Sequence, residues 1–294
     1  MTYGPDGNVW FLETQQGQVG RLSPDGATAM VGSFTTETPP IGPPTLLITG
    51  VATFAITSGP DGNLWITDEF ADRIVRLTPS GSFDRFEVPT ANSAFRSIVA
   101  GSDGALWFAE SGVGKIGRVT TDGQMVEIPL PGPSSGPEGI VTGPDGNLWF
   151  SDGSASQVRR LSTSGTLVEF PFNWGIQFGH SGAAGSDGKM WFVYGGKPGL
   201  VRVSVDGTIE TIGEGPRVWP TFLAAGPGGK MWFTEPTSQL YGWVAEDGTI
   251  STFTIPRGPD GSNYYPMALA ATPDGTVWIA SEGVLGCSFL RVKG

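Results

Sequence analysis

Short apolar stretches alternate with polar turns along the whole chain, and one eight-residue phrase recurs among them. It reads Gly-Pro-Asp-Gly-Asn-Leu-Trp-Phe at residues 143–150. It returns with substitutions at residues 4–11, 59–66, 101–108, 185–192, 226–233 and 272–279. Pro-Asp-Gly is turn chemistry, because proline presets φ, aspartate binds its own backbone and glycine tolerates positive φ. The apolar and aromatic residues that follow are typical of a strand with a buried ring.

The spacing of the phrase predicts a repeat architecture. Its tryptophans stand at positions 10, 65, 107, 149, 191, 232 and 278, which gives steps of 55, 42, 42, 42, 41 and 46 residues. A period near 42 residues that contains several strands and turns indicates the blades of a β-propeller.

Each repeat contains four strand-like segments, and no segment has helical periodicity. In the fourth repeat the segments are residues 138–142, 147–152, 157–162 and 166–170. We therefore predict an all-β, seven-bladed propeller with four-stranded blades. It forms one domain over residues 1–294, with an insertion loop at about residues 36–50 that is rich in proline.

The repeat is truncated at both ends of the chain. Only nine residues precede Trp10, and the chain ends at Gly294, soon after a third strand at residues 289–292. We expect the first and last blades to be incomplete, and we expect Met1 to be an internal residue of a longer natural chain.

Charge and composition narrow the class of partner. The net charge of −11 argues against nucleic acid or an anionic membrane surface, and it is compatible with a cationic ligand or a divalent metal. A single cysteine, Cys287, excludes an internal disulfide. No apolar run reaches the length of a membrane span. We expect a monomer that binds a small molecule, while the compartment stays open between cytoplasmic and secreted with the leader removed.

The position eleven residues before each repeat tryptophan begins an innermost strand, so its side chains can converge on the mouth of the central channel. This position holds, in order, Phe54, Arg96, Glu138, His180, Thr221 and Met267. His180, the only histidine, could act as a general base there. Glu138 could orient it or hold a divalent cation, and Arg96 could bind a carboxylate or an oxyanion. The alternative is that His180 is a hydrogen-bonded structural residue.

The position three residues after each tryptophan ends the second strand on the same face. It holds Glu13, Asp68, Glu110, Asp152, Tyr194 and Glu235. An acid that recurs in most blades favours a structural role, such as accepting loop amides. Glu282 stands one residue later in the last repeat, and this displacement makes it a candidate for function.

These phrases, together with Trp232-Phe-Thr-Glu235 and the segment from Lys115 to Gly123, resemble the streptogramin B lyase (virginiamycin B lyase) family over all seven repeats. The resemblance implies a seven-bladed propeller that opens a cyclic depsipeptide by elimination across an ester, with a histidine base and a magnesium ion. The family's late glutamate of blade seven corresponds to Glu282. Its two active-site histidines correspond to Thr221 and Met267, and a further glutamate corresponds to Tyr265.

The residues and the resemblance together give two functional hypotheses. The first is an enzyme of lyase or hydrolase type that acts on a small cyclic or ester-containing molecule at the channel mouth. Its candidate catalytic residues are His180, Glu138, Arg96 and Glu282, its candidate substrate-binding residues are Phe54, Thr221, Tyr265 and Met267, and its candidate magnesium ligands are Glu138 and Glu282. The second is a non-catalytic propeller that binds a ligand or protein on the same face.

Overall fold

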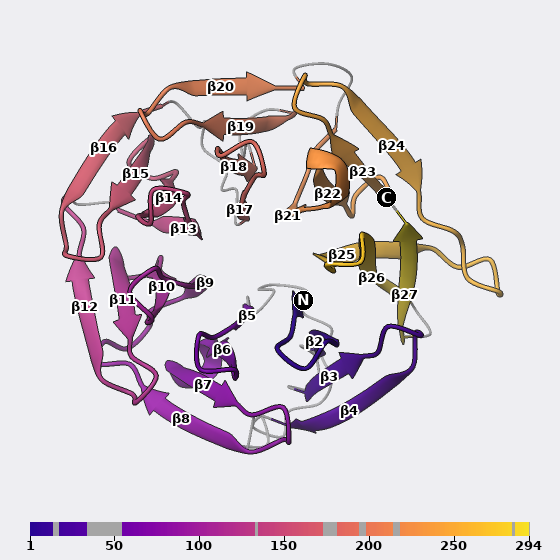
Figure 1. The fold of residues 1–294 in the computed structure, drawn as a ribbon, viewed down its shortest axis with the longest axis horizontal. Helices are drawn as coiled ribbons and strands as arrows, with labels where there is room; N and C mark the ends of the chain where they lie inside the picture. Colours follow the sequence, from indigo (N-terminus) through magenta and orange to yellow (C-terminus); the bar gives the residue numbers. More distant parts are fainter. Residues whose placement is uncertain are drawn as a thin grey trace.

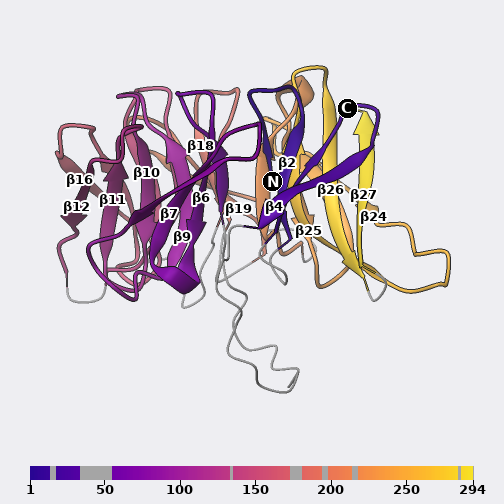
Figure 2. The same ribbon diagram turned by 90° about the horizontal axis from the view of Figure 1, so that it is seen from below.

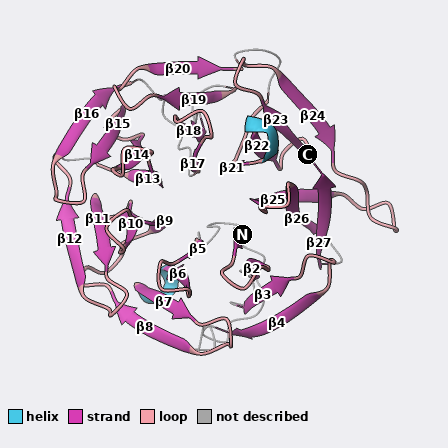
Figure 3. Ribbon diagram, in the orientation of Figure 1, coloured by secondary structure: helices cyan, strands magenta, loops and turns pink. Residues whose placement is uncertain are grey.

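The computed structural model of the chain is a ring of seven antiparallel sheets around a central axis (Figure 1). It describes residues 1–13, 18–33, 55–132, 135–172, 181–193, 198–213, 218–283 and 286–293. The prediction of an all-β, seven-bladed propeller is confirmed. In the described residues the only helices are two short 3-10 turns, η1 (Glu69–Ala71) and η2 (Pro227–Gly229), coloured cyan in Figure 3. No helix in this part of the chain is long and apolar enough to cross a membrane.

The blades follow the chain in order, and each runs outward from an inner strand. Blade one consists of β1 (Thr2–Tyr3), β2 (Val9–Glu13), β3 (Gln18–Leu22) and β4 (Thr28–Ser33). Blade two consists of β5 (Ile56–Ser58), β6 (Leu64–Asp68), β7 (Arg73–Leu77) and β8 (Phe83–Glu87). Blade three consists of β9 (Phe95–Ala100), β10 (Leu106–Glu110), β11 (Lys115–Val119) and β12 (Met125–Pro129). Blade four consists of β13 (Pro137–Thr142), β14 (Leu148–Asp152), β15 (Gln157–Leu161) and β16 (Leu167–Pro171).

The remaining blades complete the ring. Blade five consists of β17 (Gly182–Ala184), β18 (Met190–Val193), β19 (Leu200–Val203) and β20 (Ile209–Ile212). Blade six consists of β21 (Phe222–Ala225), β22 (Met231–Glu235), β23 (Leu240–Val244) and β24 (Ile250–Thr254). Blade seven consists of β25 (Tyr264–Ala271), β26 (Thr276–Gly283) and β27 (Gly286–Lys293). As expected for truncated ends, β1 has two residues and blade seven has three strands in the described part of the chain.

The hydrophobic core lies between the blades, and every repeat tryptophan is part of it. Trp149 packs with Met190 and Phe192 of the next blade, and the other repeat tryptophans do the same around the ring. All seven are at most 4 % exposed. Trp278 packs against Val9 and Phe11 of blade one, so side-chain packing closes the ring between its ends. The apolar position of the repeat therefore specifies blade-to-blade contact, which the hydrophobic effect stabilises.

The Pro-Asp-Gly turns join the first and second strands at one face of the ring, here called the turn face. In blade four the indole Nε1 of Trp149 donates to Asp145 at 3.1 Å, and Gly146 adopts φ +74°. A Cβ on Gly143 would lie 2.7 Å from the Trp149 ring, so glycine is required for this close approach. Blades one, two, three and five make the same bond from the tryptophan indole to the turn aspartate.

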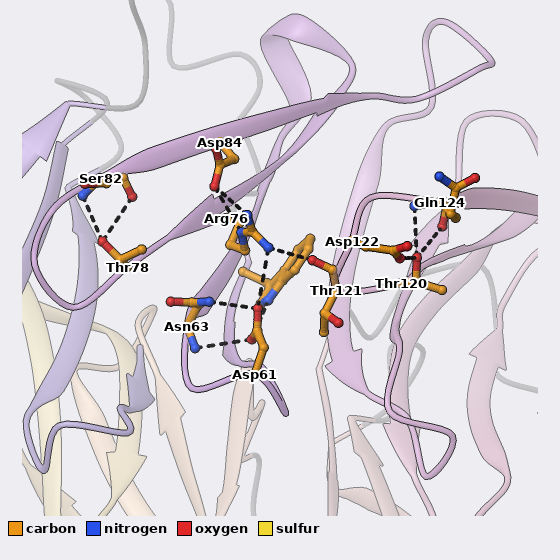
Figure 4. Close-up of polar contacts among 11 residues, drawn as sticks. Asp61, Asn63, Arg76, Thr78, Ser82, Asp84, Thr120, Thr121, Asp122 and Gln124 are labelled. Carbon is orange, nitrogen blue, oxygen red and sulfur yellow. Dashed lines mark hydrogen bonds and ion pairs between the residues drawn. The ribbon is translucent and has the colours of Figure 1, made fainter.

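An arginine on the third strand links this turn to the next blade (Figure 4). In blade two, Arg76 lies over the Trp65 ring at 5.9 Å and bonds Asp84 at 2.7 Å. Its Nη1 donates to the carbonyl of Thr121, in the turn between the third and fourth strands of blade three, at 2.6 Å. Arg160 and Arg202 make the same contact to blades five and six. The turn face is therefore tied together blade by blade.

The opposite face carries the loops from second to third strands and from each blade to the next, and we call it the loop face. The strands run between the two faces, as the side view in Figure 2 shows. The insertion at about residues 36–50 and the candidates Phe54, His180 and Tyr194 lie outside the described residues. The starts of the inner strands and the ends of the second strands meet at the loop face, which is where the candidate residues were predicted.

Candidate functional site

Two hollows open at the loop face. The first, the blade 3–4 hollow, has a volume of about 590 Å³ and is bordered by Arg96, Ser111, Ser135, Glu138 and Ser154, with several glycines. The second, the blade 6–7 hollow, has a volume of about 430 Å³ and is lined by Pro236, Thr237, Tyr265, Met267, Glu282 and Gly283. Five of the predicted candidates border these hollows, two in the first and three in the second.

The blade 3–4 hollow brings Arg96 and Glu138 together. Each is the second residue of its inner strand, and Nε of Arg96 lies 3.7 Å from Oε2 of Glu138. Ser111 donates to Oε1 of Glu138 at 3.3 Å. Glu138 is 2 % exposed, while about a quarter of the Arg96 side chain is exposed. Equivalent positions on neighbouring blades thus form an ion pair whose arginine is accessible to a small molecule.

A buried ion pair in blade four fixes one wall of this hollow. Arg159 and Asp152, each at most 1 % exposed, lie 2.9 Å apart. Arg159 also donates to the Ser135 hydroxyl at 3.0 Å and to the Pro131 carbonyl at 2.9 Å. Asp152 accepts the amide of Gly136 at 3.1 Å. The pair therefore holds the loop that joins blades three and four.

The blade 6–7 hollow brings together Tyr265, Met267 and Glu282. Tyr265 and Glu282 are direct cross-strand partners on β25 and β26, and Tyr265 is 42 % exposed. Successive side chains alternate between the faces of a strand. Ser281, at the register position of the other blades' acids, is 2 % exposed, so Glu282 lies on the opposite face of β26. The one-residue displacement seen in the sequence is what brings this carboxylate to the hollow.

Four of the other second-strand acids have partners within the fold, which is compatible with a structural role. Asp68 is bonded by Arg73 at 2.8 Å, and Glu235 accepts from Ser238 at 2.8 Å. Asp152 accepts the amides of Gly136 and Ala155. Glu110 accepts from Ser93 at 3.1 Å. Burial, assisted by the nearby Glu127 carboxylate, raises the pKa of Glu110 from 4.5 to about 7.

The remaining candidates are less closely grouped. The backbone amide of Thr221 donates to the Thr234 carbonyl at 2.8 Å, and Thr221 is not among the residues that line either hollow. The sequence patterns did not single out Arg159 or the serines of the blade 3–4 hollow. Arg159 nevertheless differs from its counterparts in the sequence, because the other repeats place valine, glycine or leucine at this position of the third strand.

A magnesium site is not preformed in the described part of the chain. Magnesium prefers several oxygen ligands in octahedral geometry. No group of three or more His, Cys, Asp or Glu side chains gathers among the described residues. Glu138 and Glu282 border different hollows, and Arg96 compensates the charge of Glu138. These residues do not fit a shared ion, and the magnesium expectation stays a prediction.

Solved structures resemble this fold over most of the chain. A streptogramin B lyase structure is 25 % identical, with a TM-score of 0.79, and the match covers 95 % of this chain and 88 % of that one. The virginiamycin B lyase of Staphylococcus aureus is 26 % identical, with a TM-score of 0.77 over 93 % and 87 % of the two chains. Its catalytically inactive histidine-to-alanine variant, solved with quinupristin, is 25 % identical, with a TM-score of 0.71 over 82 % and 83 %.

More distant propellers share the fold alone. A gluconolactonase from Xanthomonas campestris is 15 % identical, with a TM-score of 0.57 over 78 % of this chain and 82 % of its own. A comparison with curated protein sequences found no match.

The sequence profile of the Virginiamycin B lyase family matches residues 45–213, which is more than half of the chain. With the seven-bladed ring and the loop-face hollows already described, this match assigns the family. The chain belongs to the virginiamycin B lyase family.

Proposed function

We propose that this protein is an enzyme of lyase or hydrolase type that opens a small cyclic or ester-containing molecule at the loop face. The observation that carries the proposal is the Arg96–Glu138 pair, because it joins two different charged groups from equivalent positions at the border of an accessible hollow. Membership of the virginiamycin B lyase family and the likeness to two lyase structures support the same class of reaction.

His180 is the proposed general base. The inactive relative has lost a histidine, and His180 is the only histidine of this chain. In an elimination, the base removes a proton from the carbon next to the one that bears the ester oxygen. The C–O bond then breaks, which leaves an alkene and a carboxylate. In a hydrolysis, the same base would activate water for attack on the ester carbonyl.

The charged pair supports either step through its accessible guanidinium. Arg96 would bind the departing carboxylate of an elimination or the oxyanion of a hydrolysis. Glu138 holds Arg96 in place and would also favour the imidazolium form of His180. The apolar and aromatic groups of the blade 6–7 hollow would bind the body of the substrate.

The test is a screen of the purified protein against esters, lactones and cyclic depsipeptides, with and without Mg²⁺ and with a chelator. Mass spectrometry separates the two reactions, because hydrolysis adds one water to the summed products and elimination adds none. Once an activity is found, His180→Asn should lower turnover by about 10²–10⁴-fold. Arg96→Ala should lower kcat as well, because the carboxylate or oxyanion that Arg96 would bind develops only in the transition state. If His180→Asn keeps full activity, the assignment of the base is wrong.

The second candidate is a propeller that binds its ligand without turnover. It is favoured by Thr221 and Met267, which stand where the family resemblance places catalytic histidines. Ligand binding at the loop face without product formation for any substrate class, with or without metal, would support this function over the first.

A further inference from the structure

A short strained segment, residues 90–94, reaches the border of the blade 3–4 hollow, and we call it the rim segment. It connects β8 of blade two to β9 of blade three, and its last residue, Ala94, borders the hollow two residues before Arg96. Asn92 and Ala94 have φ of +61° and +46°, in the left-handed region that residues other than glycine adopt at a cost in free energy. Such a conformation persists only where surrounding contacts hold it, so these contacts fix the border of the hollow at this point.

Two carboxylates hold the backbone of the rim segment. Glu127 accepts the backbone amide and the hydroxyl of Thr90, at 2.9 and 2.6 Å. Asp72 accepts the backbone amides of Asn92 and Ser93, at 2.9 and 3.0 Å. The start and the middle of the segment are therefore bound by groups from blades three and two.

A third carboxyl group, that of Glu110, contacts the rim segment in a way that depends on a proton. The Ser93 hydroxyl lies 2.6 Å from the Thr90 carbonyl and 3.1 Å from Oε2 of Glu110. A hydroxyl has one proton to donate, and a carbonyl can only accept. Both hydrogen bonds can therefore be made at once only when Glu110 is protonated and donates to Ser93. An ionised Glu110 accepts from Ser93 only in competition with the Thr90 carbonyl.

The surroundings of Glu110 favour its protonated form. Glu110 is 0 % exposed, and its Oε1 has no hydrogen-bond partner among the described residues. The carboxylates of Glu127 and Asp72 are the negative charges that act on it, and Lys115 is the positive one. The Lys115 ammonium group is already bound to Glu127 at 2.5 Å and to Thr90 at 2.6 Å. Burial, and next the charge of Glu127, raise the pKa of Glu110 to about 7.

We propose that Glu110 is a pH-sensitive switch for the border of the blade 3–4 hollow. In its protonated form it donates to Ser93 and fixes the rim segment, and in its ionised form it gives up this bond and leaves the segment more mobile. Arg96, the charged residue of the adjacent strand β9, is paired with Glu138 of blade four. The inference concerns the shape of the hollow, so it stands whether or not the hollow is catalytic.

The first test follows the proton and the rim segment separately in the intact protein. Carbon-13 NMR of labelled glutamate, with Glu110→Gln to assign the signal, gives the titration of the Glu110 carboxyl group. The Ala94 methyl signal and the hydrogen exchange of the Asn92 and Ser93 amides report on the rim segment. We expect all three to change with one midpoint near pH 7. After correction for the intrinsic pH dependence of exchange, protection of the two amides should fall about 3- to 10-fold from pH ~6 to pH ~8.

Variants separate the switch from other effects of pH. Glu110→Gln keeps a donor at every pH, so the rim segment should stay protected and lose its pH dependence. Ser93→Ala removes the hydroxyl and leaves Glu110 to titrate, so the segment should be less protected and respond little to pH. Glu246→Gln makes the same charge change on an exposed residue of the turn face in blade six, and it should behave like the natural protein. The Gly136 amide, which Asp152 accepts in blade four, is the control within the molecule, and its corrected protection should stay constant.

Each part of the proposal can fail by itself. A Glu110 carboxyl group that does not titrate between pH ~5 and pH ~9 would overturn it. So would a titration of Glu110 that leaves Ala94 and the two amides unchanged, because the proton would then not control the rim segment. A response of the segment that survives Glu110→Gln or Ser93→Ala would assign the switch to another group. If one variant fails to fold, the natural protein and the other variant still decide between these outcomes.

Discussion

Blades four and six pair their second, third and fourth strands in the same register. They differ in the charged residues that they carry at the turn face and at the loop face. At the turn face, Asp145 of blade four accepts from the Trp149 indole, and Arg160 lies over that ring at 5.4 Å. Blade six has Gly228 at the aspartate position and Trp243 at the arginine position. Lys230 lies 4.4 Å from the centre of the Trp243 ring, and the buried Trp232 indole nitrogen has no hydrogen-bond partner among the described residues.

At the loop face, too, blade four has a charged side chain at a position where blade six has none. Arg159 pairs across the strands with Phe150 and reaches the loop that borders the blade 3–4 hollow. Its counterpart in blade six is Gly242, opposite Phe233. Both blades nevertheless bury their tryptophans against the next blade in the same way. The two blades therefore share their packing but differ in charge at both faces, and we expect these charges to make their local stabilities differ.

Removing the cation from blade four should have the largest effect on stability. Arg159→Met leaves Asp152 buried without its partner and frees the loop at Pro131 and Ser135. We expect a loss of about 3–5 kcal/mol in the free energy of unfolding, measured by urea denaturation. Arg257→Met, on an exposed residue of the loop between blades six and seven, serves as the control and should cost about 1 kcal/mol or less. Adding Asp152→Asn to Arg159→Met should recover part of the loss, and equal losses in the two single variants would contradict this account.

Blade three offers the second test, because it has Gly117 at the third-strand position where blade four has Arg159. Glu110 therefore has no arginine at the position from which Arg159 pairs with Asp152. Its folded pKa of about 7 exceeds the ordinary 4.5. Between these values the folded protein holds a proton that the unfolded chain has released, so stability falls as pH rises toward 7 and levels off above it. Glu110→Gln should remove this loss. Relative to the natural protein, the variant should gain about 1–3 kcal/mol at pH ~8 and nothing at pH ~4.

The measurement is urea denaturation of both proteins across that pH range. Glu87→Gln, at the exposed end of β8, controls for a general effect of removing one negative charge. A constant difference between Glu110→Gln and the natural protein at all pH values would show that Glu110 does not titrate in this window.

Asp145 allows a smaller test at the turn face. Burial acts to raise its pKa, but hydrogen bonds from Asn147 and Trp149 outweigh it and hold the pKa below its usual value. Asp145→Ala should cost about 1–2 kcal/mol at neutral pH, since it leaves the buried indole without an acceptor. The stabilisation is present above the unfolded pKa of 3.8 and is lost as pH falls through the folded value, so the difference should narrow in acid. Asp145→Asn, which keeps an acceptor oxygen, should recover most of the loss at neutral pH; an alanine variant as stable as the natural protein would count against the bond.

Much of the architecture could be predicted from the sequence because its signals are local. The tryptophan spacing and the Asp-Gly turns are sufficient for seven blades, and equal positions in the repeat predicted that Arg96 would lie beside Glu138. The displacement of Glu282 by one residue set it apart from the recurring acids, and in the structure it borders the blade 6–7 hollow; its function stays a prediction.

What could not be predicted depends on the path of loops and on side-chain direction. Nothing local indicates that Arg159 turns inward to bind Pro131 and Ser135, or that Ser135 reaches the same hollow as Glu138. Nor does the repeat show that the candidates divide between two hollows, since it makes all blades equivalent. His180 and Phe54 lie outside the described residues, and their roles stay predictions.

The smallest expected effect comes from giving blade six the residue that its turn lacks. Blade five has the turn Asp187-Gly188-Lys189, where Asp187 accepts from the Trp191 indole at 3.2 Å and from the Lys189 amide at 3.1 Å. Blade six has Gly228-Gly229-Lys230 at the same place. In blade five the second residue of the three, Gly188, has positive φ and Asp187 does not, whereas Gly228 and Gly229 have φ of +68° and +73°.

Gly228→Asp should therefore draw the blade-six turn toward the blade-five conformation and supply an acceptor for the Trp232 indole. The new hydrogen bond is worth about 1 kcal/mol, and the strain of any residual positive φ offsets part of it. We expect a net gain of about 0.5–1 kcal/mol in urea denaturation, together with slower exchange of the Trp232 indole proton by NMR. Gly229→Asp is the matched control, because that position has positive φ in both blades, and it should destabilise the protein. If Gly228→Asp destabilises as much as Gly229→Asp and leaves indole exchange unchanged, then position 228 requires glycine. Blade six would then differ from blade five because the backbone of its turn needs positive φ at that position.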